Sequence, residues 1–189
     1  MIRCGTSLHK RVLTGLGTLA LALGCVWSGW SAEERVEYGL GRAASEEDIR
    51  AWNIDVVPTG EGLPPGQGTV KQGGQVFAVK CAACHGPTGK GGPKDRLVGG
   101  QHTLKDAKPI KTIGSYWPYA TTLYDYINRA MPFYAPQSLT SDEVYSVIAW
   151  LLFQNGIIPE DAAIDARTLP LVQMPNRDGF VPDPRPDVR

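Results

Sequence analysis

Two cysteines and a histidine lie within five consecutive residues near the middle of the 189-residue chain, as Cys81-Ala82-Ala83-Cys84-His85. The segment that leads up to and includes both cysteines, from Val70 to Cys84, is predicted to be helical because Val70, Phe77 and Cys81 share one face. On the last turn of a helix, two thiols three residues apart point the same way, and the imidazole follows beside them. No other feature constrains the fold of this chain so strongly.

The spacing of these residues is that of c-type haem attachment. In such sites both thiols bond to vinyl groups of one porphyrin, and the histidine ligates the iron. A zinc site would need four ligands, and beyond residue 32 only His102 adds a further Cys or His. A thioredoxin-like redox pair would need a βαβ setting, whereas this pair ends a helix. We therefore predict one covalent haem c on Cys81 and Cys84, with His85 on the iron.

Met131 is the predicted sixth ligand of the iron. A helix is predicted to begin near Thr121 or Thr122 and to stop at Met131, because Pro132 disfavours helical geometry in the preceding residue. A thioether held just after a helix, in a turn stiffened by proline, can reach the iron from the face opposite His85.

Two other residues are alternatives for the sixth position. Met174 lies in a proline-rich segment, and His102 lies in a glycine-bounded loop. When the protein fills both axial positions, one-electron transfer is the chemistry left to the iron. We therefore expect an electron-transfer protein without a catalytic site of its own.

The clearest predicted helix follows Thr140, where Thr140-Ser141-Asp142-Glu143 forms a capping box. Apolar residues continue at helical spacing from Val144 to Leu152, and Asn155-Gly156 ends the helix. Residues 69–156 show no alternating strand pattern, so an all-α domain is predicted there.

Irregular arms are predicted on both sides of this domain. Residues 33–68 are rich in Gly, Pro and acidic residues, with one short amphipathic piece, Glu46 to Trp52, capped by Ser45. Residues 157–189 contain six prolines, which exclude a long helix, beside apolar residues such as Leu169 and Met174. We predict that both arms are docking elements and not parts of the haem-domain core.

Residues 1–32 are typical of a secretory signal peptide, with a basic start, an apolar stretch from Val12 to Trp27 and a small-residue cleavage site at Ser31-Ala32. Cleavage there leaves Cys81 and Cys84 as the only cysteines, in an exported protein that we expect in the periplasm. As an alternative, Ala22-Leu23-Gly24-Cys25 loosely resembles a lipoprotein box, so acylation of Cys25 would tether the protein to a membrane.

The charge of the chain gives no sign of a polyanionic partner. Lys and Arg number 19, as do Asp and Glu, and no basic tract stands out. Cleavage of the signal removes three basic groups, leaving 16 against 19 acidic ones and a net charge of −3. Nucleic acid is therefore not expected as a partner.

The central domain resembles class I cytochrome c. The resemblance lies in Gly73, Phe77, the motif Cys81 to Gly86, Met131-Pro132 and the helix from Leu139 to Leu152. It implies that Gly73 lets two helices approach closely while Phe77 packs against Trp150. In relatives, a backbone carbonyl within a Pro-x-Leu-x-Gly segment accepts a hydrogen bond from the proximal histidine. Here the corresponding residues, Asp95-Arg96-Leu97-Val98-Gly99, lack the proline.

Over nearly all of its length beyond the signal, the chain resembles the cytochrome subunit of periplasmic sulfane/sulfite dehydrogenase, from bacterial sulfur oxidation. The segments that carry this resemblance are Tyr38 to Arg42, Gly60 to Gly68, Lys111 to Pro118, Arg129 to Phe133, Met174 to Asn176, and Gly179-Phe180. The resemblance implies a partner subunit with a molybdenum cofactor, which passes electrons to this haem, and a downstream electron acceptor. Some relatives carry a second haem domain, whereas this sequence has a single CxxCH motif.

The alternative function is a free-standing periplasmic shuttle between a dehydrogenase and a terminal oxidase. A compact shuttle would have little use for two long arms that carry apolar residues. Such arms resemble segments that become ordered against a partner, so the subunit interpretation is preferred.

Overall fold

The computed structural model describes residues 38–185. The predicted signal peptide and Cys25 lie outside these residues. The chain divides into two compact units, Met1–Arg42 and Ala43–Arg189. Of the first unit, the structure describes residues 38–42, which contain no helix or strand. All elements that follow belong to the second unit.

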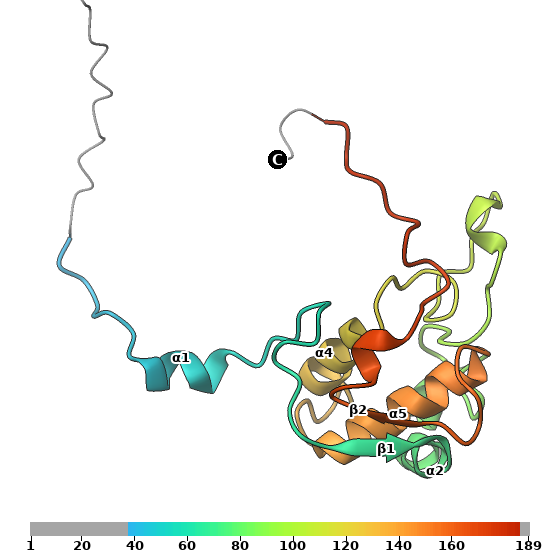
Figure 1. The fold of residues 1–189 in the computed structure, drawn as a ribbon, viewed down its shortest axis with the longest axis horizontal. Helices are drawn as coiled ribbons and strands as arrows, with labels where there is room; N and C mark the ends of the chain where they lie inside the picture. The colour runs from blue at the N-terminus through green and yellow to red at the C-terminus, as the bar shows by residue number, and fades with distance from the viewer. Residues whose placement is uncertain (1–37, 186–189) are drawn as a thin grey trace, which may run out of the picture. The chain divides into compact units, whose positions relative to one another are not determined.

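The second unit is mostly helical, as predicted, and has one very small sheet (Figure 1). Its elements in chain order are α1 (Glu46–Trp52), β1 (Gln67–Thr69), α2 (Val70–Lys80), α3 (Ala82–His85), η1 (Thr103–Lys105), α4 (Thr121–Ala130), α5 (Ser141–Gln154), β2 (Ala163–Asp165) and η2 (Leu169–Leu171). None of the helices between residues 38 and 185 has both the length and the apolar character needed to cross a membrane.

Capping boxes start three of the helices. The box predicted at Thr140 is present, and the N-cap predicted at Ser45 forms a full capping box with Asp48. A third, unpredicted box joins Thr69 to Gln72 at the start of α2. The predicted helix from Val70 to Cys84 differs in one respect. It breaks at Cys81, whose backbone leaves helical geometry (φ −122°, ψ −33°), and resumes as the single turn α3.

Helices α2 and α5 pack closely where Gly73 faces Ser146. A Cβ atom on Gly73 would lie 1.8 Å from the Ser146 carbonyl oxygen, so no larger residue fits without displacing a backbone. Beside this contact, the rings of Phe77 and Trp150 stack with their centroids 4.1 Å apart. The packing that the family resemblance implied for these three residues is confirmed.

The two arms meet in the sheet, where β1 and β2 pair antiparallel with Gly68 opposite Ile164. The sheet lies against α5 (Figure 1). A Cβ atom on Gly68 would lie 2.1 Å from the Ser146 backbone nitrogen, so this strand also approaches α5 closely. Sequence analysis missed the sheet because three residues per strand are too few to show an alternating pattern.

Side chains from both arms enter the hydrophobic core, so the prediction that the arms add nothing to it is wrong. The buried ones are Val56 from the N-terminal arm and Ile164, Leu169 and Met174 from the C-terminal arm. Further along the C-terminal arm, the Asn176 amide donates to the Tyr116 carbonyl at 2.7 Å. Local pattern could not show this, because the residues that bury these side chains lie far away in the sequence.

Candidate haem-binding site

Cys81 and Cys84 lie one helical turn apart at the junction of α2 and α3. The Cys84 backbone N–H donates to the Cys81 carbonyl oxygen at 3.1 Å, which places both side chains on one side of the turn. Both thiols are free and half-buried. They can therefore present two sulfur atoms to a single flat group.

The electrostatic setting of this pair differs from that of a thiol redox site. Burial, and then the charge of the neighbouring Cys84 thiolate, raise the pKa of Cys81 to about 11. Redox-active cysteine pairs instead depend on a lowered thiolate pKa. The sheet formed by the described residues is a single antiparallel pair, which also differs from the βαβ setting of a thioredoxin-like motif.

His85 has a fixed tautomer, because its Nδ1 lies 2.7 Å from the backbone carbonyl oxygen of Asp95. A carbonyl oxygen can only accept, so Nδ1 carries the proton and Nε2 keeps its lone pair for a metal ion. A backbone acceptor of this kind orients a ligating histidine and fixes its tautomer. The hydrogen bond therefore forms although Asp95 stands where relatives carry a proline.

A tight loop brings Asp95 back to His85. Gly86 has a positive φ of 77°, and the Lys94 N–H donates to the Cys84 carbonyl at 2.9 Å. A Cβ atom on Gly92 would lie 2.2 Å from that same carbonyl. Only glycine permits so close an approach, and the result is a loop folded directly onto the Cys-Cys-His turn.

Asn155 holds the segment after Asp95 from the other side, a role that sequence analysis missed. Its buried amide oxygen accepts from the Gly99 N–H at 3.0 Å, and its amide nitrogen donates to the Leu97 carbonyl at 3.3 Å and the Leu151 carbonyl at 2.9 Å. Asn155 was predicted only to end α5, which it does. Its position before Gly156 gives no sign of the loop that it supports.

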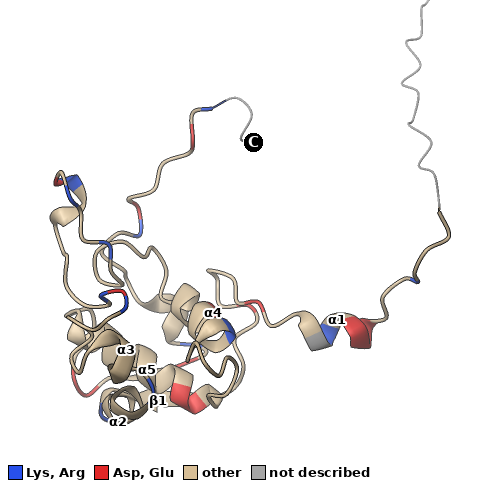
Figure 2. Cartoon of the chain, turned by 180° about the vertical axis from the view of Figure 1, so that it is seen from behind, with Lys and Arg blue, Asp and Glu red and all other residues tan. Residues whose placement is uncertain are grey.

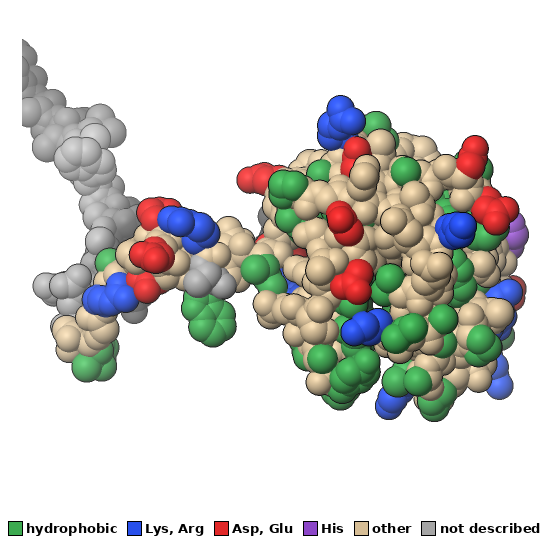
Figure 3. Space-filling model, turned by 90° about the horizontal axis from the view of Figure 1, so that it is seen from below, with side chains coloured by type: hydrophobic (Ala, Val, Ile, Leu, Met, Phe, Trp, Pro, Cys, Tyr) green, Lys and Arg blue, Asp and Glu red, His purple; other side chains and the backbone are tan. Residues whose placement is uncertain are grey.

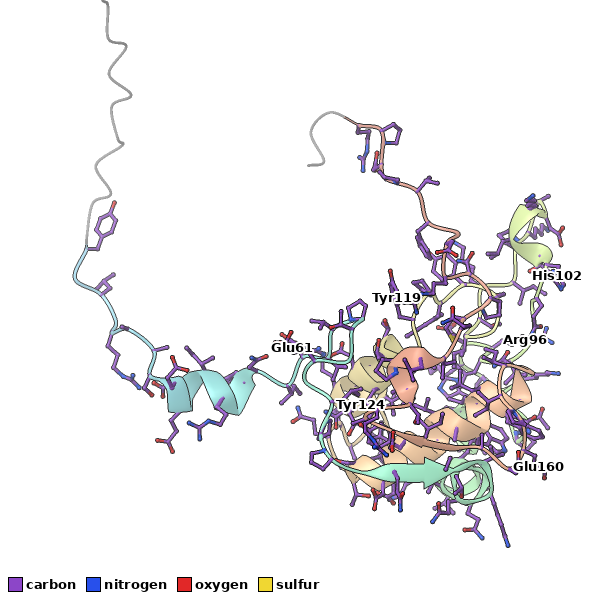
Figure 4. The ribbon with its side chains drawn as sticks, in the orientation of Figure 1. Glu61, Arg96, His102, Tyr119, Tyr124 and Glu160 are labelled. Atoms are coloured by element: carbon purple, nitrogen blue, oxygen red, sulfur yellow. The ribbon has the colours of Figure 1, made fainter. Side chains whose placement is uncertain are left out.

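Met131 directly follows α4, as predicted. Its backbone N–H donates to the Ile127 carbonyl at 3.0 Å, and its own backbone is extended (φ −127°, ψ 145°), so the helix ends there. The side chain is half-buried, and Pro132 behind it is buried. Of the two alternatives, Met174 is buried in the core, and His102 is exposed on the loop that carries η1 (Figure 4).

The donor set of this site fits a haem. Two thiols on one side of a helical turn match thioether attachment, and an imidazole with a free Nε2 matches proximal ligation. Among residues 38–185, no group of three or more Cys, His, Asp or Glu side chains could hold a metal ion by itself. Two thiols and one imidazole on a single turn suit a prosthetic group that brings most of its own metal ligands.

Comparison with known proteins agrees with this assignment. Residues 68–151 match the family described as cytochrome c oxidase, cbb3-type, subunit III. A chain in the crystal structure of the sulfane dehydrogenase SoxCD from Paracoccus pantotrophus is 45% identical, with a TM-score of 0.73, and the match covers 79% of this chain and 74% of that one. The search of curated proteins found no significant match.

The two matches confirm the predicted family, fold and function. The family match covers most of the central domain and one residue of the N-terminal arm. The structural match covers more of the chain than residues 69–156 could supply, so it extends further into the arms. The chain therefore belongs to the cytochrome c family and is an electron carrier that resembles SoxD, the cytochrome subunit of the SoxCD sulfane dehydrogenase.

Proposed function

We propose that the chain carries one haem c, bonded to Cys81 and Cys84, with His85 and Met131 as its axial ligands. The hydrogen bond from His85 Nδ1 to Asp95 supports the proximal assignment, since it leaves Nε2 free. The extended backbone of Met131 after α4 supports the distal one. When bound, haem supplies reversible one-electron transfer, while the protein sets its ligation, burial and access.

We further propose that the protein works in the periplasm, as the electron-accepting subunit of a molybdenum-containing sulfane or sulfite dehydrogenase, and passes electrons to a downstream acceptor. The observation that carries this proposal is the 45% identity to a chain of SoxCD over 79% of the sequence. A free-standing shuttle would share the haem domain with such a subunit but would have no need to share the arms.

Exposed apolar side chains give the protein a surface suited to docking. Phe133 and Tyr134 are both largely exposed, and they follow Met131 within three residues. Exposed aromatic residues are enriched at protein interfaces. Figure 3 shows hydrophobic side chains grouped at the surface of one face. A partner seated over Phe133 and Tyr134 would lie close to the haem, as electron transfer requires.

Co-purification tests the assignment of the partner. The full-length protein, tagged and isolated from the periplasmic fraction of its own cells, should bring down a protein with a molybdenum cofactor in a constant ratio. Elution of the cytochrome alone, still able to reduce a terminal oxidase, would favour the free-standing shuttle.

Mass spectrometry tests the number of haems and their attachment. After acid–acetone extraction, the intact mass should retain one haem, and the double substitution Cys81→Ala and Cys84→Ala should abolish it. Retention of covalent haem by the double variant would contradict the attachment site.

A further inference from the structure

Four residues of the N-terminal arm, Asp55 to Pro58, lie along α4 and are here called the strap. Val56 is buried, with 8% of its surface exposed, and its backbone N–H donates to Asp125 Oδ1 at 2.9 Å. At the start of the helix, the Thr121 hydroxyl donates to the Pro58 carbonyl at 3.2 Å. The strap is therefore held along α4 by side chains of the helix itself.

Arg129, in the last turn of α4, connects the strap to the end of the helix. Figure 2 shows a basic part of α4 and acidic residues in the chain that joins α1 to the rest of the unit. Its Nη1 lies 2.7 Å from Asp55 Oδ1, and its Nη2 pairs with Asp125, one helical turn earlier. Asp125 thus binds both the Val56 N–H and the Arg129 guanidinium. One carboxylate and one guanidinium together join the strap to the final turn of α4.

That turn sets the position of Met131. Helix ends fray unless other contacts hold them, and in the last turn of α4 Arg129 makes such contacts with Asp55 and Asp125. Met131 lies two residues after Arg129, and its N–H is held only by the last turn, through the Ile127 carbonyl. If the turn loosens, the backbone that carries the methionine sulfur loosens with it.

We propose that the strap keeps Met131 on the haem iron, with Asp125 and Arg129 as positioning residues. The proposal rests on the proposed function for one point, the ligation by Met131. An exposed ion pair contributes little to stability by itself. Here the Asp125 carboxylate also accepts a hydrogen bond from the backbone N–H of Val56, whose side chain is buried. The strap therefore favours the ligated state over one in which the last turn of α4 has opened.

The test measures how readily the sixth position opens in the haem-loaded, full-length protein. Its readouts are the rate of carbon monoxide binding to ferrous haem and the far-red absorption band that a methionine ligand gives ferric haem. Asp125→Ala should speed carbon monoxide binding about tenfold, the change expected when about 1.4 kcal/mol of a charged hydrogen bond is lost. Arg129→Gln should have a smaller effect, and the two effects should not add, because both variants break one network.

Asp142→Ala is the matched control. Asp142 accepts the Gln67 backbone N–H at 2.8 Å, so it also fastens the N-terminal arm to a helix through a carboxylate, but on α5. This variant should leave the carbon monoxide rate and the far-red band unchanged. An equal effect of Asp142→Ala and Asp125→Ala would show general loosening of the fold and would overturn the strap proposal.

Met131→Ala separates failure of this proposal from failure of the ligand assignment. If Met131→Ala does not open the sixth position, the assignment of Met131 itself is wrong. If it opens the position while Asp125→Ala and Arg129→Gln both leave it closed, Met131 is the ligand and the strap does not position it. Arg129→Gln replaces an exposed side chain, so it remains informative if Asp125→Ala reduces folding.

Discussion

The C-terminal arm and helix α1 of the N-terminal arm both carry apolar residues, but in different surroundings. The apolar residues of the C-terminal arm lie among prolines, and those of α1 lie among acidic residues. In the C-terminal arm, Leu169 is 0% exposed and Met174 is buried in the core. In α1, Ile49 is 46% exposed and Trp52 is 86% exposed. The difference in burial follows strand pairing and not composition, because β2 pairs with β1 and is followed after three residues by η2, which buries Leu169.

The largest effect on stability is expected from Leu169→Ala, which tests this comparison. Removal of a fully buried leucine side chain leaves a cavity, so the free energy of unfolding should fall by about 2–5 kcal/mol. Leu171, two residues later in the same turn, is 71% exposed, so Leu171→Ala should change it by less than about 0.5 kcal/mol. Urea unfolding of the haem-loaded protein measures both. Equal losses of unfolding free energy in the two variants would show that the C-terminal arm does not stabilise the domain through its buried side chain.

A somewhat smaller effect is expected from Gly68→Ala, which acts on the sheet that fastens the C-terminal arm. The added methyl group would lie 2.1 Å from the Ser146 nitrogen, so β1 would have to move away from α5. Overpacking of this kind costs about 1–3 kcal/mol. Gly74→Ala is the comparison variant. Its new Cβ would lie 3.2 Å from the Trp150 ring, which must shift slightly, while alanine favours the helix by about 0.5–1 kcal/mol, so thermal unfolding should show no comparable loss.

Trp52→Ala should hardly affect the stability of the isolated protein. A side chain that is 86% exposed contributes little to the folded state, so we expect a change within about 0.5 kcal/mol. If α1 docks on the molybdenum subunit, the same variant should weaken co-purification with that subunit. A large loss of stability would instead show that α1 packs against its own domain, as the C-terminal arm does.

The smallest effect concerns pH and the carboxylate at the end of β2. The N–H and hydroxyl of Thr168, and then the Arg167 N–H, donate to Asp165 and lower its pKa. A lowered pKa stabilises the fold at neutral pH, and this contribution is lost as the pH falls below about 4 through the folded-state pKa. Thermal unfolding from pH 7 to pH 3 should therefore show a smaller acid-induced loss for Asp165→Asn than for the natural protein. An acid-induced loss of thermal stability of the same size in both proteins would show that the hydrogen bonds to Asp165 do not contribute to the pH dependence of folding.

Sequence alone predicted the features that have a local signature. The capping box at Thr140, the helix stop at Met131 and the Cys-Cys-His turn each depend on residues close together in the chain. The contact between Gly73, Phe77 and Trp150 is long-range, but a family pattern revealed it.

Other features had no local signature and were missed or assigned wrongly. The family pattern pointed to a carbonyl within Asp95 to Gly99 as the partner of His85. Because a carbonyl is a backbone group that any residue would supply, the sequence left open whether the hydrogen bond forms without the proline. Asn155 resembles an ordinary helix end, and its second role depends on a distant loop. Leu169 and Met174 lie in a segment without helical or strand periodicity, so only the tertiary fold shows that they are buried.

The pairing of β1 with β2 has a consequence for the order of events during synthesis. β1 precedes the Cys-Cys-His turn, and β2 follows the last long helix, so nearly the whole domain lies within the loop that the sheet closes. A chain made from its N-terminus exposes Cys81, Cys84 and His85 long before Asp165 exists. Closure of a loop this long also carries an entropic cost that only the finished contacts repay. The haem-attachment residues are therefore accessible on an incompletely folded chain before the last strand locks the domain around them.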